Sequence, residues 1–245
     1  TFHPQICLVA IEPVSDFLLL EQYAPQRDAA TWNQCLDERL AGWSVTVCQV
    51  TSDEAKALLA HAEQHLGAHH SPDLFHVQHE TVQATSLVLA SQTRRAHESA
   101  SQALQQTRQR QQELAACQEQ CPQSTQLAEL QRQANEAVAA QAAAQQKLTA
   151  CQQRQQQATE ARRGLSRDYH PIDLESGKRL TAEEVGRRLS GHFDCLDEIA
   201  REAHLSSRAK EKLAKARRLL VAMQSTIVFF WKTVTARLGA WQLPA

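Results

Sequence analysis

The amino-acid sequence predicts a helix-dominated α+β protein, in which a small strand-containing region precedes a long helical insertion and a set of C-terminal helices. The chain has 245 residues but only 7 glycines and 7 prolines, too few turn residues for an all-β sandwich. Short apolar runs alternate with helix signals through residues 1–80, whereas the middle of the chain is rich in glutamine and alanine. Because glutamine and alanine favour helix, we expect the middle to differ in structure from the first region.

The first region opens with the signals of a β-hairpin. Ile6–Ile11 and Phe17–Leu20 are apolar runs separated by a short polar segment, which is typical of two antiparallel strands. Asp28 is a predicted N-cap, and the helix that it starts is expected to end at Gly42. The chain is therefore expected to begin with two strands and a helix.

A second strand-and-helix pattern completes the domain predicted for residues 1–80. Val45–Val50 is predicted as a strand, and Glu54–Ala62 as a helix capped by Ser52 or Asp53. Asp73–Val77 is predicted as one more strand. Hairpin strands followed by alternating helices and strands form an α/β layer, so we expect a mixed sheet here.

Residues 81–164 are predicted to form an antiparallel coiled-coil hairpin. Residues 101–160 contain 20 Gln and 13 Ala, and no glycine occurs between Gly67 and Gly164. In the second half of this region leucines recur every three or four positions together with small and polar residues, as in a heptad seam with weak apolar content. Gln-rich disorder is the alternative interpretation. The turn between the two helices is expected at Cys121, Pro122, Gln123 and Ser124.

Residues 165–245 are predicted to be a helical region that follows an extended loop at Tyr169–Gly177. Thr181 and Glu184 have the spacing of a capping box, which predicts a helix through about Ala203. A last helix is expected from Ser206 or Ser207 to about residue 238. One face of it steps by three and four and is expected to be buried: Leu213, Ala216, Leu220, Met223, Ile227, Phe230 and Val234.

Charge and cysteine content restrict the location and the partners of the protein. Residues 1–80 contain 11 acids and 3 Lys/Arg, a net charge of −8, whereas the remainder contains 16 acids and 23 Lys/Arg, a net of +7. Such a division suggests an acidic part that holds cations and a basic part that meets a polyanion. The seven cysteines match no zinc or disulfide spacing, which favours reduced thiols of a cytoplasmic protein. The longest apolar run, near Thr226–Trp231, is too short for a membrane span, so no membrane partner is expected.

Asp53 is the leading candidate for chemistry. It follows a predicted strand and precedes a predicted helix, the position at which α/β sheets present functional groups. Phosphoryl-transfer enzymes place carboxylates there, because their metal ions must be held by acids from separate elements. The alternative is an ordinary N-cap or turn acid.

The region around Asp53 resembles bacterial DDE-type transposases. The resemblance rests on Val50–Leu58, in which the Asp precedes a short helix, and on Ser71–Val77, which supplies an acid-x-Phe-His segment about twenty residues later. The order of strands and helices in residues 6–80 is also similar to an RNase H-like catalytic domain, and the predicted hairpin occupies the slot of a known type of helical insertion.

The resemblance implies DNA transposition that depends on Mg²⁺ or Mn²⁺, with Asp53 as the second of three catalytic acids. The first acid would lie upstream of Thr1 and the third beyond Ala245, because no acid after Arg163 carries a convincing motif. The chain would then be a fragment, unable to catalyse the reaction alone. Asp73 and His76 are secondary catalytic candidates, and an edge-capping role for this polar pair is equally compatible with the sequence.

Two further clusters of side chains are candidate binding sites, one for DNA and one for zinc. Arg208, Lys210, Lys212, Lys215, Arg217 and Arg218 are expected to contact DNA phosphates, or else to form the solvated face of an amphipathic helix. His61, His65 and His69 have the spacing of a zinc site on one helical face, although Gly67 argues that they are solvent-facing histidines. The alternative to a transposase is a non-catalytic protein, or a degenerate transposase remnant, that self-associates through the helical hairpin.

Overall fold

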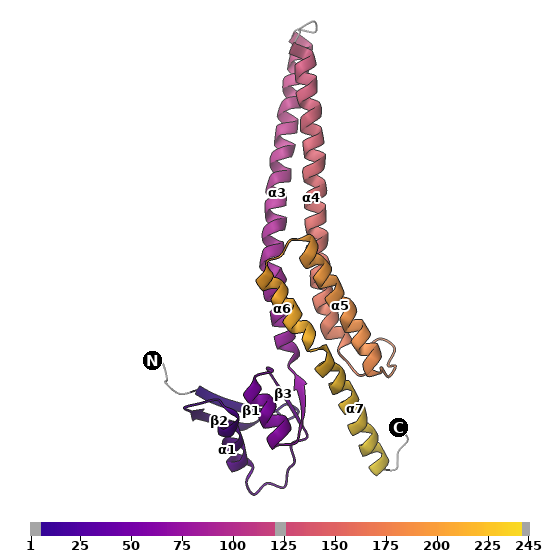
Figure 1. Ribbon diagram of the computed structural model, residues 1–245. Helices are drawn as coiled ribbons and strands as arrows, with labels where there is room; N and C mark the ends of the chain where they lie inside the picture. The colour runs from indigo at the N-terminus through magenta and orange to yellow at the C-terminus, as the bar shows by residue number, and fades with distance from the viewer. Residues whose placement is uncertain (1–5, 121–125, 242–245) are drawn as a thin grey trace. The chain divides into compact units, whose positions relative to one another are not determined.

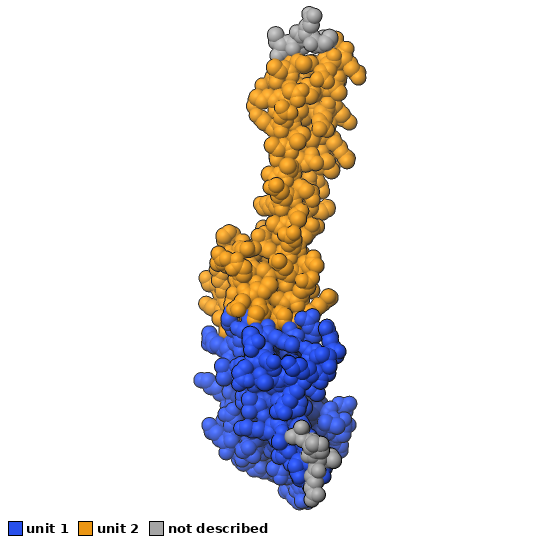
Figure 2. All heavy atoms as spheres, turned by 90° about the vertical axis from the view of Figure 1, so that its right-hand side faces the viewer, with its two compact units in different colours: residues 1–79, 166–190, 216–245 blue, residues 80–165, 191–215 orange. Residues whose placement is uncertain are grey.

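The computed structural model describes residues 6–120 and 126–241. Two compact units divide it: unit 1 comprises residues 1–79, 166–190 and 216–245, and unit 2 comprises residues 80–165 and 191–215 (Figure 2). Helices dominate and a few short strands accompany them, so the predicted α+β class is confirmed. The elements in chain order are β1 (Ile6–Glu12), β2 (Phe17–Ala24), α1 (Ala29–Leu40), β3 (Gln49–Ser52), α2 (Lys56–Leu59), the π-helix η1 (Ala60–His65), β4 (His69–Pro72), α3 (Leu74–Gln120), α4 (Gln126–Asp168), α5 (Ala182–Glu202), α6 (Ser207–Arg218) and α7 (Leu220–Ala240).

The predicted β-hairpin and the helix after it are confirmed in unit 1. β1 pairs antiparallel with β2, and the turn between them is closed by Glu12, whose carboxylate accepts hydrogen bonds from the backbone N–H groups of Val14 and Ser15. A hydrogen bond from the Ser15 hydroxyl, together with these backbone bonds, holds the pKa of Glu12 below its ordinary value. At the start of α1 the Asp28 carboxylate accepts from the Thr31 N–H at 2.8 Å. One face of the hairpin packs on α1 through a small core: Leu8, Leu20, Ala24 and Cys35.

The remaining strands correct the predicted sheet. β3 and β4 pair parallel to each other, and the described strands form two separate two-stranded sheets instead of one mixed sheet. β3 begins at Gln49, later than the predicted Val45–Val50, and β4 ends at Pro72. Asp73–Val77 was predicted as a strand, but it begins α3, because the Asp73 carboxylate accepts the Phe75 N–H in the manner of a helix cap.

The segment between β3 and β4 contains a π-helix. Within η1 the backbone N–H of Leu66 donates to the carbonyl of His61 at 3.0 Å, five residues earlier. The histidines of η1 bond to α1: Nδ1 of His61 lies 2.7 Å from Oδ1 of Asn33, and Nε2 of His65 lies 2.9 Å from Asp37. The predicted helix at Glu54–Ala62 is therefore present, but it begins later, at Lys56, and its second half is a π-helix.

The C-terminal helices differ from the prediction in one respect. The capping box of α5 is confirmed, because the Thr181 N–H donates to Glu184 Oε2 at 2.8 Å and the Glu184 N–H donates to Thr181 Oγ1 at 3.1 Å. The single last helix that we predicted is interrupted at Leu219, which separates α6 from α7. Four members of its apolar face, Leu213, Ala216, Met223 and Ile227, are buried, whereas Leu220 is half-buried and Phe230 is exposed.

In unit 1, α7 packs against β4. The ring of Phe229 stacks on the imidazole of His69 with centroids 4.4 Å apart, and the Thr226 hydroxyl donates to Ser71 Oγ at 3.1 Å. The indole Nε1 of Trp231 donates to the carbonyl of Leu180 at 3.0 Å. These contacts join three distant parts of the chain into one unit.

By length and composition alone, one described helical segment, Ser207–Ala240, is apolar enough to cross a membrane. Its best 18-residue window has a mean hydropathy of 1.4, and 11% of that window is buried. The sequence-based expectation missed it because Gln224, Ser225 and Thr226 interrupt the apolar run without adding charge. Within unit 1 the same segment makes the specific polar contacts with β4 described above.

Unit 2 contains the helical hairpin. α3 and α4 run side by side (Figure 1), and the Thr107 hydroxyl on α3 donates to the Ala137 carbonyl on α4 at 3.0 Å. The predicted pairing of two long helices is thus confirmed, and a seam cluster of Ala96, Ala100, Leu148 and Cys151 is buried between them. The heptad geometry of a coiled coil stays a prediction, and the predicted turn at Cys121, Pro122, Gln123 and Ser124 lies outside the described residues.

Candidate functional site

The candidate site lies at the carboxyl edge of the parallel pair β3–β4. Ser52 pairs with Pro72 at the end of the two strands, and the Asp73 N–H donates to the Ser52 carbonyl at 3.0 Å. Asp53 and Asp73 therefore follow neighbouring strand ends. The prediction that Asp73 would lie near Asp53 rested on a strand at Asp73–Val77. Instead, Asp53 and Asp73 follow neighbouring strand ends because β4 (His69–Pro72) pairs in parallel register with β3.

Asp53 is exposed and lightly engaged. Its Oδ1 accepts the backbone N–H of Ala55 at 3.3 Å, a local bond that orients the side chain at the start of the short helix α2. Within the described part of the chain its other oxygen has no hydrogen-bond donor. The carboxylate is thus accessible to a cation, and its role as a metal ligand stays a prediction.

Glu54 is a member of this edge that sequence reasoning missed. Its side chain is half-buried, and Oε1 is shielded from solvent without a hydrogen-bond partner among the described residues. A buried carboxylate oxygen without a donor costs free energy, on the order of 1–3 kcal/mol, unless a cation or water satisfies it. The sequence shows only that Glu54 follows Asp53. It does not show that the Glu54 carboxylate is shielded, because that burial depends on packing.

Asp73 and His76 form a carboxylate–histidine pair. Oδ1 of Asp73 accepts the Phe75 N–H at 2.9 Å, and Oδ2 lies 2.8 Å from Nδ1 of His76, which donates to it. Both oxygens of Asp73 are thereby occupied by the first turn of α3. Asp73 consequently acts as a helix cap and as the residue that orients His76, and we do not count it among the available metal ligands.

The histidine cluster does not form one helical face. His61 and His65 belong to η1 and bond to α1, whereas His69 lies on β4 and stacks on Phe229. Desolvation lowers the pKa of His61 and of His69, so burial favours the neutral rings. Across residues 6–120 and 126–241 no three His, Cys, Asp or Glu side chains are grouped so as to hold a metal ion.

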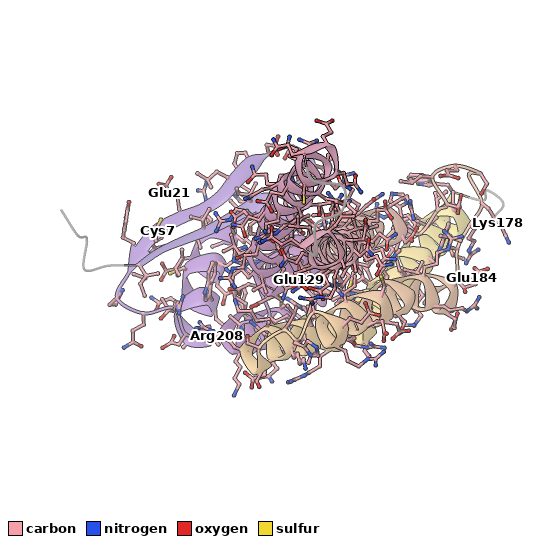
Figure 3. All side chains as sticks on the ribbon, turned by 90° about the horizontal axis from the view of Figure 1, so that it is seen from above. Cys7, Glu21, Glu129, Lys178, Glu184 and Arg208 are labelled. Carbon is pink, nitrogen blue, oxygen red and sulfur yellow. The ribbon has the colours of Figure 1, made fainter. Side chains whose placement is uncertain are left out.

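The basic cluster of α6 is only partly available to a polyanion. In unit 2, Nζ of Lys215 donates to Glu80 Oε1 at 2.9 Å and Lys212 lies 3.6 Å from the other oxygen, and these cations lower the pKa of Glu80. In unit 1, Arg217 donates to the Ser190 hydroxyl at 3.5 Å. Three members are exposed and have no protein partner in the described chain: Arg208, which is labelled in Figure 3, Lys210 and Arg218.

Three acids after Arg163, namely Glu198, Glu202 and Glu211, have the spacing of surface charges and lie at the surface. Glu198 bonds to Arg201 on the same helix turn, and its pKa is lowered by that guanidinium. Glu202 and Glu211 are exposed.

Comparison with protein-family models, with curated proteins and with solved structures finds no match to this chain.

Proposed function

We propose that this chain is part of a DNA transposase whose catalytic domain is RNase H-like and requires Mg²⁺ or Mn²⁺. The observation that carries the proposal is the carboxyl edge of β3–β4, where Asp53 presents an exposed carboxylate and the next residue, Glu54, has a shielded carboxylate oxygen. Parallel strands followed by helices present catalytic groups at this edge. The basic residues Arg208, Lys210 and Arg218 supply exposed charge suited to DNA phosphates.

The donors at this edge fit a hard divalent cation in type. Carboxylate oxygens are the ligands that Mg²⁺ prefers, and Asp53 would hold the ion with Glu54 beside it. The chemistry that such an ion supplies is activation of an oxygen nucleophile, first water and then a DNA 3′-hydroxyl. Two neighbouring carboxylates fall short of the three acids that the proposed reaction uses, so we derive no catalytic step from them.

Paramagnetic Mn²⁺ provides the direct test of Asp53. We expect Mn²⁺ to broaden the backbone amide resonances of residues 52–55 in NMR spectra of the whole chain. The Asp53→Asn variant should need an Mn²⁺ concentration about tenfold higher for the same broadening, because one ligand charge is lost. Asp16→Asn is the matched control. Asp16 is exposed in the β1–β2 turn with φ of 55°, a conformation that Asn tolerates. Equal broadening in both variants would contradict the proposal.

A non-catalytic interaction protein is the second candidate, and the long hairpin of α3 and α4 favours it. Such a protein would self-associate through the exposed faces of these helices. Sedimentation equilibrium distinguishes the two candidates when it is combined with the Mn²⁺ titration. Concentration-dependent dimers without Mn²⁺ binding at Asp53 would favour the interaction protein.

A further inference from the structure

A second candidate site lies in unit 1 and shares no residue with the carboxyl edge of β3–β4. A groove of about 550 Å³ runs between residues 179–183 and one face of α7. Its lining includes the apolar residues Val228 and Ala236 and two cations, Arg179 and Lys232. All of these residues belong to unit 1. We name it the Arg179 groove.

The groove contains a preorganised stack of a cation on an aromatic ring. The guanidinium carbon of Arg179 lies 4.2 Å from the ring centroid of Trp231. The indole itself is fixed, because its Nε1 donates to the Leu180 carbonyl at 3.0 Å. Arg179 therefore lies over a fixed aromatic ring, and because Arg179 is exposed and lines the groove, we expect the guanidinium face away from Trp231 to be open to the groove.

The charges of the groove favour an anion. In the part of the chain that the structure describes, neither Arg179 nor Lys232 makes an ion pair or a side-chain hydrogen bond, and the one acid in the lining is Glu183. Helix α7 contains Lys232 and Arg237 and no acidic residue at all. An uncompensated guanidinium stacked on an aromatic ring is a common platform for an unpaired nucleobase, since a base has both a flat face and a nearby phosphate.

We propose that the Arg179 groove binds single-stranded DNA. One base stacks on the open face of Arg179, its phosphate pairs with Lys232, and the sugar contacts Val228. This inference rests on the proposed function for the identity of DNA as the partner, because transposition exposes unpaired strand ends. It adds a contact that is separate from both Asp53 and the basic residues of α6.

Fluorescence anisotropy with a labelled oligonucleotide of roughly 20 nucleotides tests the proposal on the whole chain. We expect Arg179→Ala combined with Lys232→Ala to weaken single-strand binding about tenfold or more, and to reduce the slope of log K against log salt by about 0.7, since the one phosphate contact, at Lys232, is lost. Arg179→Lys keeps the charge but loses the planar stack, so it should weaken binding to single strands more than to the duplex.

The matched control replaces two exposed cations of unit 1 that lie outside the groove, Arg27→Ala with Lys56→Ala. Equal binding by the groove variant and this control would overturn the inference. So would a groove variant that loses binding to anionic lipid vesicles but not to single-stranded DNA, because the surface would then be a lipid contact of α7. The Mn²⁺ titration at Asp53 is independent of these outcomes, so the proposed function and the groove can fail separately.

Discussion

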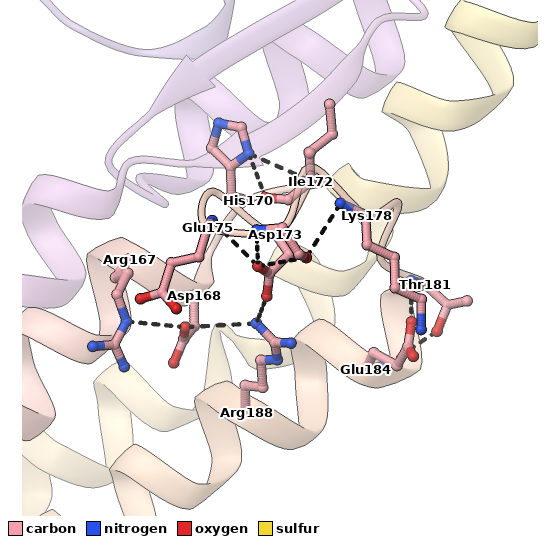
Figure 4. A network of polar contacts seen from close by, with 11 residues as sticks. Arg167, Asp168, His170, Ile172, Asp173, Glu175, Lys178, Thr181, Glu184 and Arg188 are labelled. Carbon is pink, nitrogen blue, oxygen red and sulfur yellow. Dashed lines mark hydrogen bonds and ion pairs between the residues drawn. The ribbon is translucent and has the colours of Figure 1, made fainter.

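At the residue scale, the carboxylate of Asp173 accepts hydrogen bonds from both the loop before α5 and α5 itself. In the loop before α5 it accepts the Ser176 N–H at 3.0 Å, the Ser176 hydroxyl at 2.9 Å and Nη1 of Arg188 at 2.9 Å (Figure 4). The backbone bond from Ser176 and the Arg188 guanidinium hold the pKa of Asp173 well below its ordinary value. The carboxylate thus connects the loop to the first turns of α5.

The pH dependence of stability should reveal this network. Because the folded-state pKa is depressed, the stabilisation is complete above the ordinary carboxyl pKa of about 3.9 and is lost as the pH falls toward the folded value. We expect Asp173→Asn to lower the melting temperature at pH 7, and the difference from wild type to shrink below about pH 4. Thermal melts followed by circular dichroism measure this, with Glu175→Gln, an exposed acid of the same loop, as control. A difference that does not change with pH would contradict the assignment.

The sequence predicted some site residues better than others. Asp53 could be placed at a strand end, because a strand followed by a helix is a local pattern. Asp73 could not, since the choice between a strand and a helix cap depends on pairing with β3. The burial of Glu54 and the bond between Asp173 and Arg188 depend on packing of distant residues, which local sequence does not report.

At the element scale, Gly164 allows close approach of two helices in unit 2. A Cβ at Gly164 on α4 would overlap the imidazole ring of His192 on α5. Gly191 also lies within α5, but a Cβ there would meet nothing within 4 Å. The same change of side chain should therefore have opposite effects at the two positions.

We expect Gly164→Ala to destabilise unit 2, because the His192 ring must leave its position between the helices. Gly191→Ala should instead stabilise α5 by about 0.5–1 kcal/mol, since alanine loses less backbone entropy in a helix. Urea unfolding curves of the two variants and the wild type measure both effects. Similar stabilisation at both glycines would show that the His192 ring moves aside at negligible cost.

The elements themselves were predictable where their signals are local. The capping box of α5, the N-cap Asp28 and the spacing of buried residues in α4 are readable from short stretches of sequence. The break at Leu219 was missed because neither glycine nor proline marks it. β3 and β4 have four residues each, too few for alternation to define their ends, so their mutual register determines them.

At the scale of the whole molecule, both units are assembled from separate stretches of chain. Unit 1 takes residues from the beginning, from the loop before α5 and from α7, whereas unit 2 joins the hairpin to parts of α5 and α6. Composition suggested three consecutive regions, 1–80, 81–164 and 165–245. The third of these contributes to both units, and contacts such as Phe229 on His69 cannot be anticipated from composition.

Truncation should therefore affect the two units differently. A chain that ends at Arg218 lacks α7, so β4 loses the stack of Phe229 on His69 and the bond of Thr226 to Ser71. We expect hydrogen exchange, followed by mass spectrometry, to accelerate by about tenfold or more in residues 49–72. Residues 96–107 and 137–151 serve as the internal control, because the hairpin seam needs no residue of α7. Unchanged exchange in residues 49–72 would show that β3–β4 is stable without its helical cover.

The π-helix η1 has a consequence for how this chain can change over evolutionary time. A π turn contains one residue more than an α turn, so insertion of a single residue into an ordinary helix produces one. Deletion of one residue between Ala60 and His65 would restore regular winding while both strand ends, at Ser52 and His69, keep their pairing. It would also rotate His61 away from Asn33 and thereby break one link between η1 and α1. Relatives that differ in length by one residue at this position should therefore also differ at the position of Asn33.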